Sequence, residues 1–426
     1  MNSMIITLLI LLAVIIAFIS GKIPMSMIGI LTIFALVVFK VVPAKTAFSS
    51  FTDSSVLLFA AMFIVAKGIQ KTTIVTSAAN LVKKFKDKPR LLTFFACIIA
   101  FFLAIVSNGT IALVVMLPIL TSICDDIDLP RSKLLYPYVV TAVSSAGAWF
   151  LGIGALNMSW SSVMIKLGAK TPLNINDFLI ARLPFIIVII LYMTFIGPKL
   201  LPAVDNKKIA EVNSNSKKEK KTTTLSKPKN IIGIIIIALT IILMILSSYI
   251  KVDSYLIAIG GAVCLVLFGV LDNKEALGAL NLNIIFLISG MLSLADALQS
   301  SGAGKLLGQA MANVASGIHN DFLLMGLFFL VTIVLTNFLG GLGAVSILVP
   351  LWTVTALQMG LDPRGAVLAA STASAFSFLI PIGGRSLLLI VDEGGYKYSD
   401  FIKCGLPLMI ILCIMGCFVP QFMYPL

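Results

Sequence analysis

The stretch Ala61-Met62-Phe63-Ile64-Val65-Ala66-Lys67-Gly68-Ile69-Gln70 returns later in the chain, with its charge reversed, as Gly290-Met291-Leu292-Ser293-Leu294-Ala295-Asp296-Ala297-Leu298-Gln299. Met62 matches Met291, Lys67 matches Asp296, and Gln70 matches Gln299. A similar offset relates further pairs: Leu117-Pro118 and Val349-Pro350, Pro130-Arg131 and Pro363-Arg364, Asp177-Phe178 and Asp400-Phe401. Self-similarity at a fixed spacing predicts an internal duplication.

The composition is that of a membrane protein. Of the 426 residues, 59% are hydrophobic and only 12% are charged. Soluble domains carry about 25% charged residues. Several segments, including 5–20, 25–39, 180–196, 231–248 and 406–423, approach or reach the ~20 apolar residues needed to cross a bilayer. We expect an all-α polytopic membrane protein, with a solute site where two duplicated units meet near the bilayer midplane.

Basic residues gather in two places, and these predict the orientation. A net charge of +13 would suggest a nucleic-acid partner in a soluble protein, but here it is concentrated at 83–90 and in the polar stretch 205–230. Both fit the rule that cytoplasmic loops are rich in Lys and Arg. We therefore expect a multi-pass protein of the cell membrane with no nucleic-acid partner. Its N-terminus and the 205–230 linker would be cytoplasmic, and its C-terminus outside.

The flanking charges also predict two re-entrant hairpins. The segment at about 91–123 has cytoplasmic-type charges on both sides, so it must return to the side from which it enters. Its tip falls at Ser107-Asn108-Gly109-Thr110, and the matching hairpin at about 320–358 has its tip at 336–343. Irregular backbone at that depth is tolerated only inside protein or beside a water-filled cavity, so both tips are candidate sites.

These features divide the chain into an N-terminal transmembrane helix (1–22), a first membrane repeat (23–204), a basic cytoplasmic linker (205–230) and a second repeat (231–426). We expect about five transmembrane helices and one hairpin in each repeat, with the two repeats inverted relative to each other. A glycine-interrupted helix follows each hairpin, at 147–157 and at 380–386. Broken helices expose N-termini that favour anions and C-termini that favour cations.

Several motifs resemble those of the divalent anion/sodium symporter family, a branch of the ion transporter superfamily. That family carries Ser-Asn-Thr shortly before a proline at each hairpin tip; counting back from Pro118 and Pro350 places Asn108-Gly109-Thr110 and Gly340-Gly341-Leu342 there. Residues 152–157 resemble the family's Ile-Gly-Thr-Pro-Pro-Asn, and 375–388 resemble Ala-Phe-x-x-Pro-Ile-Gly-x-x-Thr-Asn-Leu-Leu. Residues 394–401 resemble Gly-Gly-Tyr-x-x-x-Asp-Phe, so the resemblance covers nearly all of residues 20–426.

The resemblance implies that oxygens at the tips hold sodium and substrate carboxylates, and that the protein is a homodimer. The candidate substrate-binding residues are Asn108, Gly109, Thr110, Asn157, Gly340, Gly341, Gly384, Arg385 and Ser386. The candidate sodium ligands are Ser107, Asn108, Gly152, Gly154, Thr336 and Asn337. Because Gly340, Gly341 and Leu342 supply no side-chain oxygen, sodium binding in the second half would rest on backbone carbonyls with Thr336 and Asn337.

Charged residues inside apolar segments add further hypotheses. Arg385 departs from the family, where the side chain is neutral; it would bind an anionic substrate, replace a second sodium ion, or pair at the aqueous rim with Asp392 or Glu393. Lys67 and Asp296 would lie at helix ends, bridge the two halves, or relay protons. Asp53 is expected to cap its helix rather than carry a proton.

The function expected from these observations is secondary active transport of a small anion by elevator-type movement. The anion would be a di- or tricarboxylate or sulfate, and co-transport with sodium is expected. Proton-coupled or exchange transport, cation/proton antiport and a channel remain alternatives. An enzyme is not expected, because no HExxH, GxSxG, P-loop or pair of intramembrane aspartates occurs.

Overall fold

A computed structural model describes residues 3–73, 85, 88–204, 206, 226–315, 317–318, 320–380 and 385–425. Within these ranges the chain is helical and contains no strand, which confirms the all-α class. Ten of the described helices are long and apolar enough to cross a membrane. Most of the predicted basic linker, and the lysines at 83, 84 and 86, lie outside the described residues.

The first half begins with four helices that precede a helical pair. They are α1 (Ser3–Ser20), α2 (Met25–Val38), α3 (Ala44–Ser49) and, after the short η1 (Ser50–Thr52), α4 (Ser54–Lys71). The pair is α6 (Pro89–Val106) and α7 (Gly109–Asp126), and the broken helix that follows consists of α8 (Ser132–Ser145), η2 (Gly152–Leu156) and α9 (Asn157–Lys166). The half closes with α10 (Asp177–Phe195) and α11 (Gly197–Leu200).

The second half repeats this order. Its leading helices are α13 (Lys227–Ile245), α14 (Ser247–Ile250), α15 (Ser254–Leu267), α16 (Asn273–Ala279) and α17 (Leu282–Ser301), followed by α18 (Ala303–Ala315). The pair is α19 (Asp321–Leu339) and α20 (Gly341–Gln358), the broken helix is α21 (Pro363–Ala373) and α22 (Arg385–Gly394), and the last helix is α23 (Tyr398–Met423). Both α7 and α20 have 18 residues, and both α9 and α22 have 10, which agrees with the predicted duplication.

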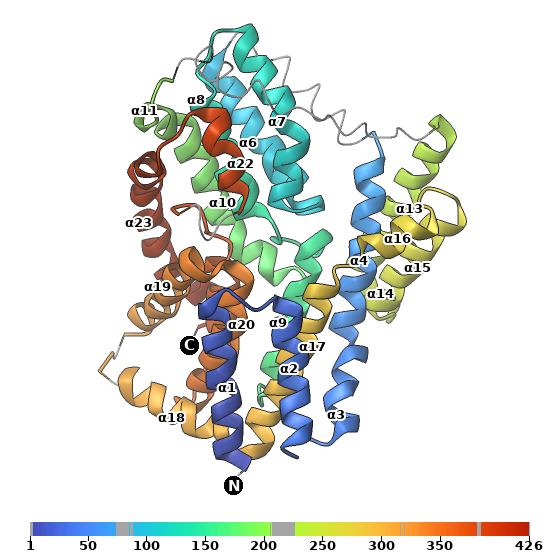
Figure 1. The fold of residues 1–426 in the computed structure, drawn as a ribbon, viewed down its shortest axis with the longest axis vertical. Helices are drawn as coiled ribbons and strands as arrows, with labels where there is room; N and C mark the ends of the chain where they lie inside the picture. Colours follow the sequence, from blue (N-terminus) through green and yellow to red (C-terminus); the bar gives the residue numbers. More distant parts are fainter. Residues whose placement is uncertain are drawn as a thin grey trace.

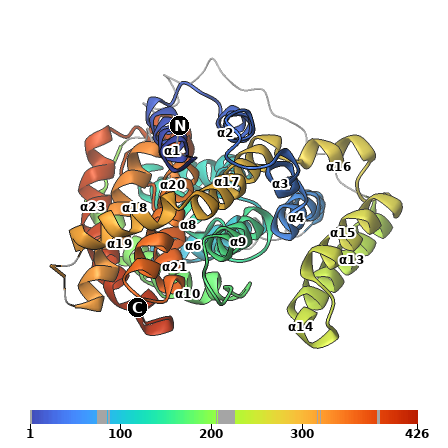
Figure 2. The same cartoon turned by 90° about the horizontal axis from the view of Figure 1, so that it is seen from below.

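The leading helices of the two halves pack against each other. Helix α2 packs against α17, and α4 packs against α15, so each half contributes a helix to the other half's bundle. Glycine permits the first of these contacts, because a Cβ on Gly29 would overlap the carbonyl oxygen of Phe286. Helices α13, α15 and α16 lie to one side of the molecule, beyond α4 (Figures 1 and 2).

The buried apolar side chains form two clusters. One joins the leading helices of both halves with α9 and α20, and the other joins α6, α7, α8 and α10 with α19 and α23. In the second cluster Phe185 on α10 stacks on Phe329 of α19 at 5.4 Å between ring centroids. Figure 1 shows α6 and α7 in the upper part of the molecule and α20 lower down, so the two pairs approach the middle from opposite ends.

Two of the predictions for charged residues have clear outcomes. The Asp53 carboxylate accepts a hydrogen bond from the backbone N of Ser55 at 2.9 Å, so it is a helix cap as expected. The hypothetical bridge between Lys67 and Asp296 is wrong, because Asp296 pairs with Lys166 at 2.6 Å. The end of α9 brings Lys166 beside α17, which no local pattern in the sequence indicates.

Candidate functional site

The first tip is closed by its own polar side chains. The Oδ1 of Asn108 accepts from the backbone N of Ile111 at 2.8 Å and caps α7. The hydroxyl of Ser107 donates to the carbonyl of Leu103 at 2.6 Å at the end of α6. Asn108 therefore satisfies an N–H group that the start of α7 leaves without a partner, whereas the Leu103 carbonyl also accepts from the backbone N of Ser107 at 3.0 Å.

The broken helix of the first half packs directly on this tip. Gly152 has a φ of +55°, and a Cβ there would lie 2.6 Å from the carbonyl oxygen of Ser107. Only glycine meets both conditions without strain. The structure therefore brings the predicted sodium residues Ser107 and Gly152 together, and Gly154 belongs to the same short turn.

The second tip is closed by backbone conformation instead. Gly340, between α19 and α20, has a φ of +77°. A Cβ on the next residue, Gly341, would overlap the carbonyl oxygen of Ser374 at the end of α21. The first half contains the corresponding contact, because a Cβ on Gly109 would lie 3.0 Å from the carbonyl oxygen of Ala142. The spacings agree, 341 − 109 = 232 and 374 − 142 = 232, and this shared contact supports the duplication.

The polar side chains near the second tip face away from the cavity described below. The Asn337 amide donates to the carbonyls of Ile333 at 2.8 Å and Phe376 at 3.1 Å, and its oxygen accepts from the backbone N of Leu379 at 3.1 Å. The Thr336 hydroxyl is buried and has no hydrogen-bond partner among the described residues. Neither residue lines the cavity.

A cavity of about 1080 Å³ lies between the two tips. It is also lined by both broken helices, by the α1–α2 connection and by the start of α17. Among the predicted substrate residues, the lining includes Asn108, Gly109, Thr110, Asn157, Gly340, Gly341 and Ser386. Gly384 lies outside the described residues, and Arg385 begins α22 with a side chain that is not described. Of the predicted sodium residues, only Asn108 lines this cavity.

Polar contacts join the two halves across the cavity wall. The hydroxyls of Thr110, at the start of α7, and Ser386, at the start of α22, lie 2.8 Å apart. The amide nitrogen of Asn157 donates to the Gly147 carbonyl at 2.6 Å, and its oxygen accepts from the Ser371 hydroxyl at 3.1 Å. Asn157 therefore ties one broken helix to the other as well as lining the cavity.

Three helices begin at the cavity wall. Gly109 and Gly341 are the first residues of α7 and α20, and Ser386 is the second residue of α22. Helix α9 continues directly from η2, and the N–H of its first residue, Asn157, donates to η2 carbonyls. The first N–H groups of a helix have no partner within the helix, and the helix dipole makes this end positive. The wall therefore offers several backbone groups that favour negative charge.

Lys22 and Arg182 are the only charged side chains among the described residues that line the cavity. Neither was among the predicted site residues. Arg182, on α10, is 2% exposed. The signal that could have identified it is the one applied to Arg385, an ionised residue inside an apolar run, here 178–196.

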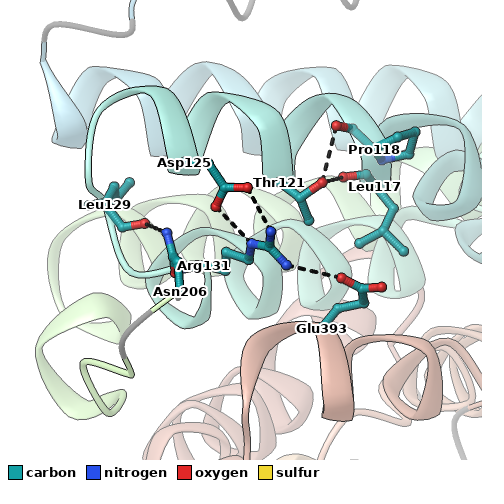
Figure 3. Close-up of polar contacts among 8 residues, drawn as sticks. All are labelled: Leu117, Pro118, Thr121, Asp125, Leu129, Arg131, Asn206 and Glu393. Carbon is teal, nitrogen blue, oxygen red and sulfur yellow. Dashed lines mark hydrogen bonds and ion pairs between the residues drawn. The ribbon is translucent and has the colours of Figure 1, made fainter. Parts of the chain in front are cut away.

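A second charged group lies away from the tips and joins the first pair of helices to α22 (Figure 3). Arg131 donates to both carboxylate oxygens of Asp125, at 2.9 and 2.6 Å, and to Glu393 at 3.2 Å. Asn206 accepts from the backbone N of Arg131 at 3.0 Å and donates to the carbonyl of Leu129 at 2.9 Å. Glu393, one of the carboxylates suggested as a partner for Arg385, is thus paired with Arg131.

Comparison with known proteins gives relatives that are transporters. The chain is 24% identical over 397 residues to an uncharacterized transporter of Haemophilus influenzae, a match that covers 88% of this chain and 82% of that protein. It is 31% identical over 197 residues to the uncharacterized transporter sll0640 of Synechocystis, covering 46% of this chain but 31% of the relative. The sodium-dependent low-affinity dicarboxylate transporter 1 of Caenorhabditis elegans is 25% identical over 152 residues, or 35% of this chain and 25% of that protein.

Solved structures share the fold at low sequence identity. The YdaH transporter of Alcanivorax borkumensis aligns with a TM-score of 0.66 at 13% identity, covering 89% of this chain and 87% of that one. MtrF of Neisseria gonorrhoeae aligns with a TM-score of 0.65 at 14% identity, covering 100% and 95%. The first is described as a transporter and the second as illuminating a class of antimetabolite efflux pumps, and the likeness agrees with the all-α fold.

The family comparison covers most of the chain. The model of the citrate transporter family matches residues 15–371, which include both tips and the first broken helix. With the relatives above, it supports a secondary transporter of carboxylate-type anions and confirms the expectation that the protein is not an enzyme. The chain belongs to the citrate transporter family.

Proposed function

We propose that this protein is a secondary active transporter that binds a di- or tricarboxylate in the cavity between the two tips, with sulfate as a further anion to test. The observation that carries this proposal is the charge of the cavity wall. Its charged side chains among the described residues, Lys22 and Arg182, are both positive, and the helices α7, α20 and α22 begin there. A carboxylate is a planar acceptor that hydrogen-bonds to backbone N–H groups and to hydroxyls.

Thr110 and Ser386 are the hydroxyls proposed to contact the anion. They already lie 2.8 Å apart, one on each half, so a carboxylate oxygen that accepts from both would hold α7 and α22 together. The backbone of Gly109, Gly340 and Gly341 would contact the anion at the starts of α7 and α20. The missing Cβ atoms of Gly109 and Gly341 face α8 and the end of α21 and let the tips pack there. Gly384 and Arg385 are proposed to complete the second broken helix's share of the site, with the Arg385 guanidinium as a charged donor.

Sodium is proposed as the coupling ion, bound behind the first tip. Ser107, Asn108, Gly152 and Gly154 are the proposed ligands, and the close approach of Gly152 to the Ser107 carbonyl supports this grouping. The sodium-dependent dicarboxylate transporters of C. elegans also support it, at 25% and 27% identity. Thr336 and Asn337 are the proposed ligands of a second ion, should one bind.

Alternating access is proposed to move the two pairs and the broken helices against the leading helices. We further propose a homodimer in the cell membrane, with the N-terminus and the 205–230 linker cytoplasmic and the C-terminus outside. The linker lysines would then favour anionic lipid headgroups.

The experiment that tests this function is a thermal-unfolding matrix on the purified protein. Citrate, succinate, malate, sulfate and phosphate are each added in sodium and in potassium. A ligand at about a hundred times its dissociation constant stabilises by ~2.7 kcal/mol. The proposal expects one carboxylate to stabilise the protein more in sodium than in potassium. Stabilisation that is indifferent to sodium would favour proton-coupled or exchange transport, and no stabilisation by any of these anions would contradict the proposed substrate class.

Transport itself is then measured in proteoliposomes with the anion that stabilises the protein. Uptake driven by a sodium gradient should saturate and should accumulate substrate above its outside concentration. Flux that only equilibrates the substrate would indicate a channel. Asn108→Ala should raise the half-saturation for sodium and substrate together, because the tip then loses both its helix cap and an oxygen.

A further inference from the structure

We infer that the Arg182 guanidinium is a resident cation of the transport site, fixed where a second coupling ion would otherwise bind. This inference deepens the proposed function and rests on it. Arg182 comes from α10, outside both pairs and both broken helices, and its side chain reaches the wall of the cavity.

The acceptors of Arg182 are backbone carbonyls at two helix ends. Its Nη1 donates to the carbonyl of Ala146, the C-terminal cap of α8, at 2.8 Å. Its Nη2 donates to the carbonyl of Ser371, in the last turn of α21, at 2.6 Å. The last carbonyls of a helix lack partners within the helix and lie at the negative end of its dipole. One helix C-terminus from each half therefore places a carbonyl oxygen against the Arg182 guanidinium. Backbone carbonyls surround a bound cation in the same way.

The charge of Arg182 has no carboxylate partner among the described residues, and no carboxylate lines the cavity. An ionised side chain at bilayer depth is costly unless it faces a cavity or a partner. The Nε–H of Arg182 is buried and has no acceptor among the described residues. A buried donor without an acceptor is unusual in a folded protein. An anion in the cavity would offset the cost of the unpaired positive charge.

Arg182 also lies behind the second tip. The Ser371 carbonyl that accepts from Arg182 accepts a second bond from the Ser374 hydroxyl at 2.8 Å. The Ser374 carbonyl in turn is the group against which Gly341 packs. The second tip thus approaches its site through glycine backbone, and the positive charge there comes from Arg182. This accounts for a tip in which Gly340, Gly341 and Leu342 offer no side-chain oxygen to a sodium ion.

The test removes the charge while keeping a side chain that still hydrogen-bonds. Arg182→Gln keeps an amide near the Ala146 and Ser371 carbonyls and adds an oxygen, so it should create a site for a small cation. Arg182→Lys keeps the charge. Arg364→Gln is the matched control, because Arg364 is the second residue of α21, pairs with Asp362 at 2.5 Å, and does not line the cavity.

The first readout is the difference in melting temperature between sodium and potassium chloride at equal ionic strength, without substrate. For Arg182→Gln it should exceed the wild-type difference by about 1–2 °C, because the shift from a modest ligand, about 2–4 °C in a domain of 150–250 residues, is smaller in a longer chain. Arg182→Lys and Arg364→Gln should keep the wild-type difference. The same difference in Arg182→Gln as in wild type would overturn the inference, because a merely structural arginine would lower stability equally in both salts.

The second readout is the affinity for the stabilising anion, which Arg182→Gln should lower at least tenfold and Arg182→Lys should lower less. If Arg182→Gln does not fold, Arg182→Lys is the deciding variant. A wild-type sodium response with retained anion binding supports a resident charge at this position. Loss of anion binding in a stable Arg182→Lys protein overturns the inference. If the wild type binds no carboxylate, the proposed function fails. The sodium readout uses no carboxylate and still decides the role of Arg182.

Discussion

The two tips occupy equivalent places and reach closure by different means. At the first tip, the Asn108 side chain caps α7 and the Ser107 hydroxyl donates to a carbonyl in the last turn of α6. At the second, Gly340 turns the chain through a positive φ, and Asn337 is fully engaged with backbone groups inside the protein. Under the proposed function, the first tip supplies oxygens to a mobile cation, and the second depends on backbone and on the fixed charge of Arg182.

Gly341→Ala should have the largest effect, because the new methyl group would overlap the Ser374 carbonyl, which is backbone and cannot turn away. Overpacking of this kind costs ~1–3 kcal/mol. We expect a lower melting temperature and loss of most anion uptake, measured in proteoliposomes. Gly109→Ala should act in the same direction but less strongly, since its nearest neighbour would be the Cα of Val143 at 2.9 Å.

The control for both is Gly260→Ala on α15, where a Cβ would meet nothing within 4 Å. In a helix this change is expected to be neutral or to stabilise by ~0.4–1 kcal/mol. Equal effects of Gly341→Ala and Gly260→Ala would show that the second tip does not need its close approach to α21.

Ser107→Ala and Thr336→Val compare the two tips as cation sites. Loss of a ligand oxygen at the first tip should raise the sodium half-saturation of uptake about tenfold, since a hydrogen bond or contact with a charge contributes ~1.5–3 kcal/mol. Thr336→Val should leave it unchanged, because the positive charge at the second tip is assigned to Arg182, and the buried Thr336 hydroxyl has no hydrogen-bond partner among the described residues to lose. A reversed pattern would move sodium binding to the second tip.

Thr110→Val and Ser386→Ala probe the contact that joins the halves. Each removes one hydroxyl of a pair 2.8 Å apart, so each should weaken anion binding by ~0.5–1.5 kcal/mol, about two- to tenfold. The double variant should cost less than the sum of the two, since both changes remove the same interaction. Strictly additive losses, measured as anion dissociation constants, would mean that the two hydroxyls act separately.

Glu393→Gln should have the smallest effect. It weakens the 3.2 Å contact with Arg131 but leaves the two bonds from Arg131 to Asp125 in place. Partly exposed ion pairs contribute ~0–1 kcal/mol. We expect a small drop in melting temperature and unchanged anion affinity; a change in affinity without a change in stability would show that this contact controls the position of α22.

Local sequence patterns were sufficient to predict the all-α fold and the location of both tips. The spacing between Pro118 and Pro350 matches Gly109 to Gly341. The structure repeats a backbone contact of these two glycines at the same spacing. The length of a hydrophobic run and the positions of glycine and proline depend on local conformation. They therefore predict where helices begin and end in the structure. The placement of Thr110 and Asn157 at one cavity follows from the same reasoning.

Contacts between distant segments could not be predicted in this way. Arg182 is 189 residues from Ser371 in sequence, and Lys166 is 130 residues from Asp296. Such partners depend on how α10 and α9 pack, which no single-sequence pattern specifies. Arg385 and Arg182 are both charged residues in apolar runs. This pattern predicts that a charge lies near a site, but it does not predict which of the two lines the cavity.

The measurement that tests the difference between the tips most directly is the sodium dependence of carboxylate uptake by the wild-type protein in proteoliposomes. One mobile ion at the first tip and a fixed charge at the second predict a simple hyperbola, with a Hill coefficient of about 1. Cooperative dependence, with a coefficient approaching about 2, would place a second sodium ion at the other tip and contradict the role assigned to Arg182. Uptake with no dependence on sodium would contradict the role assigned to Ser107 and Asn108.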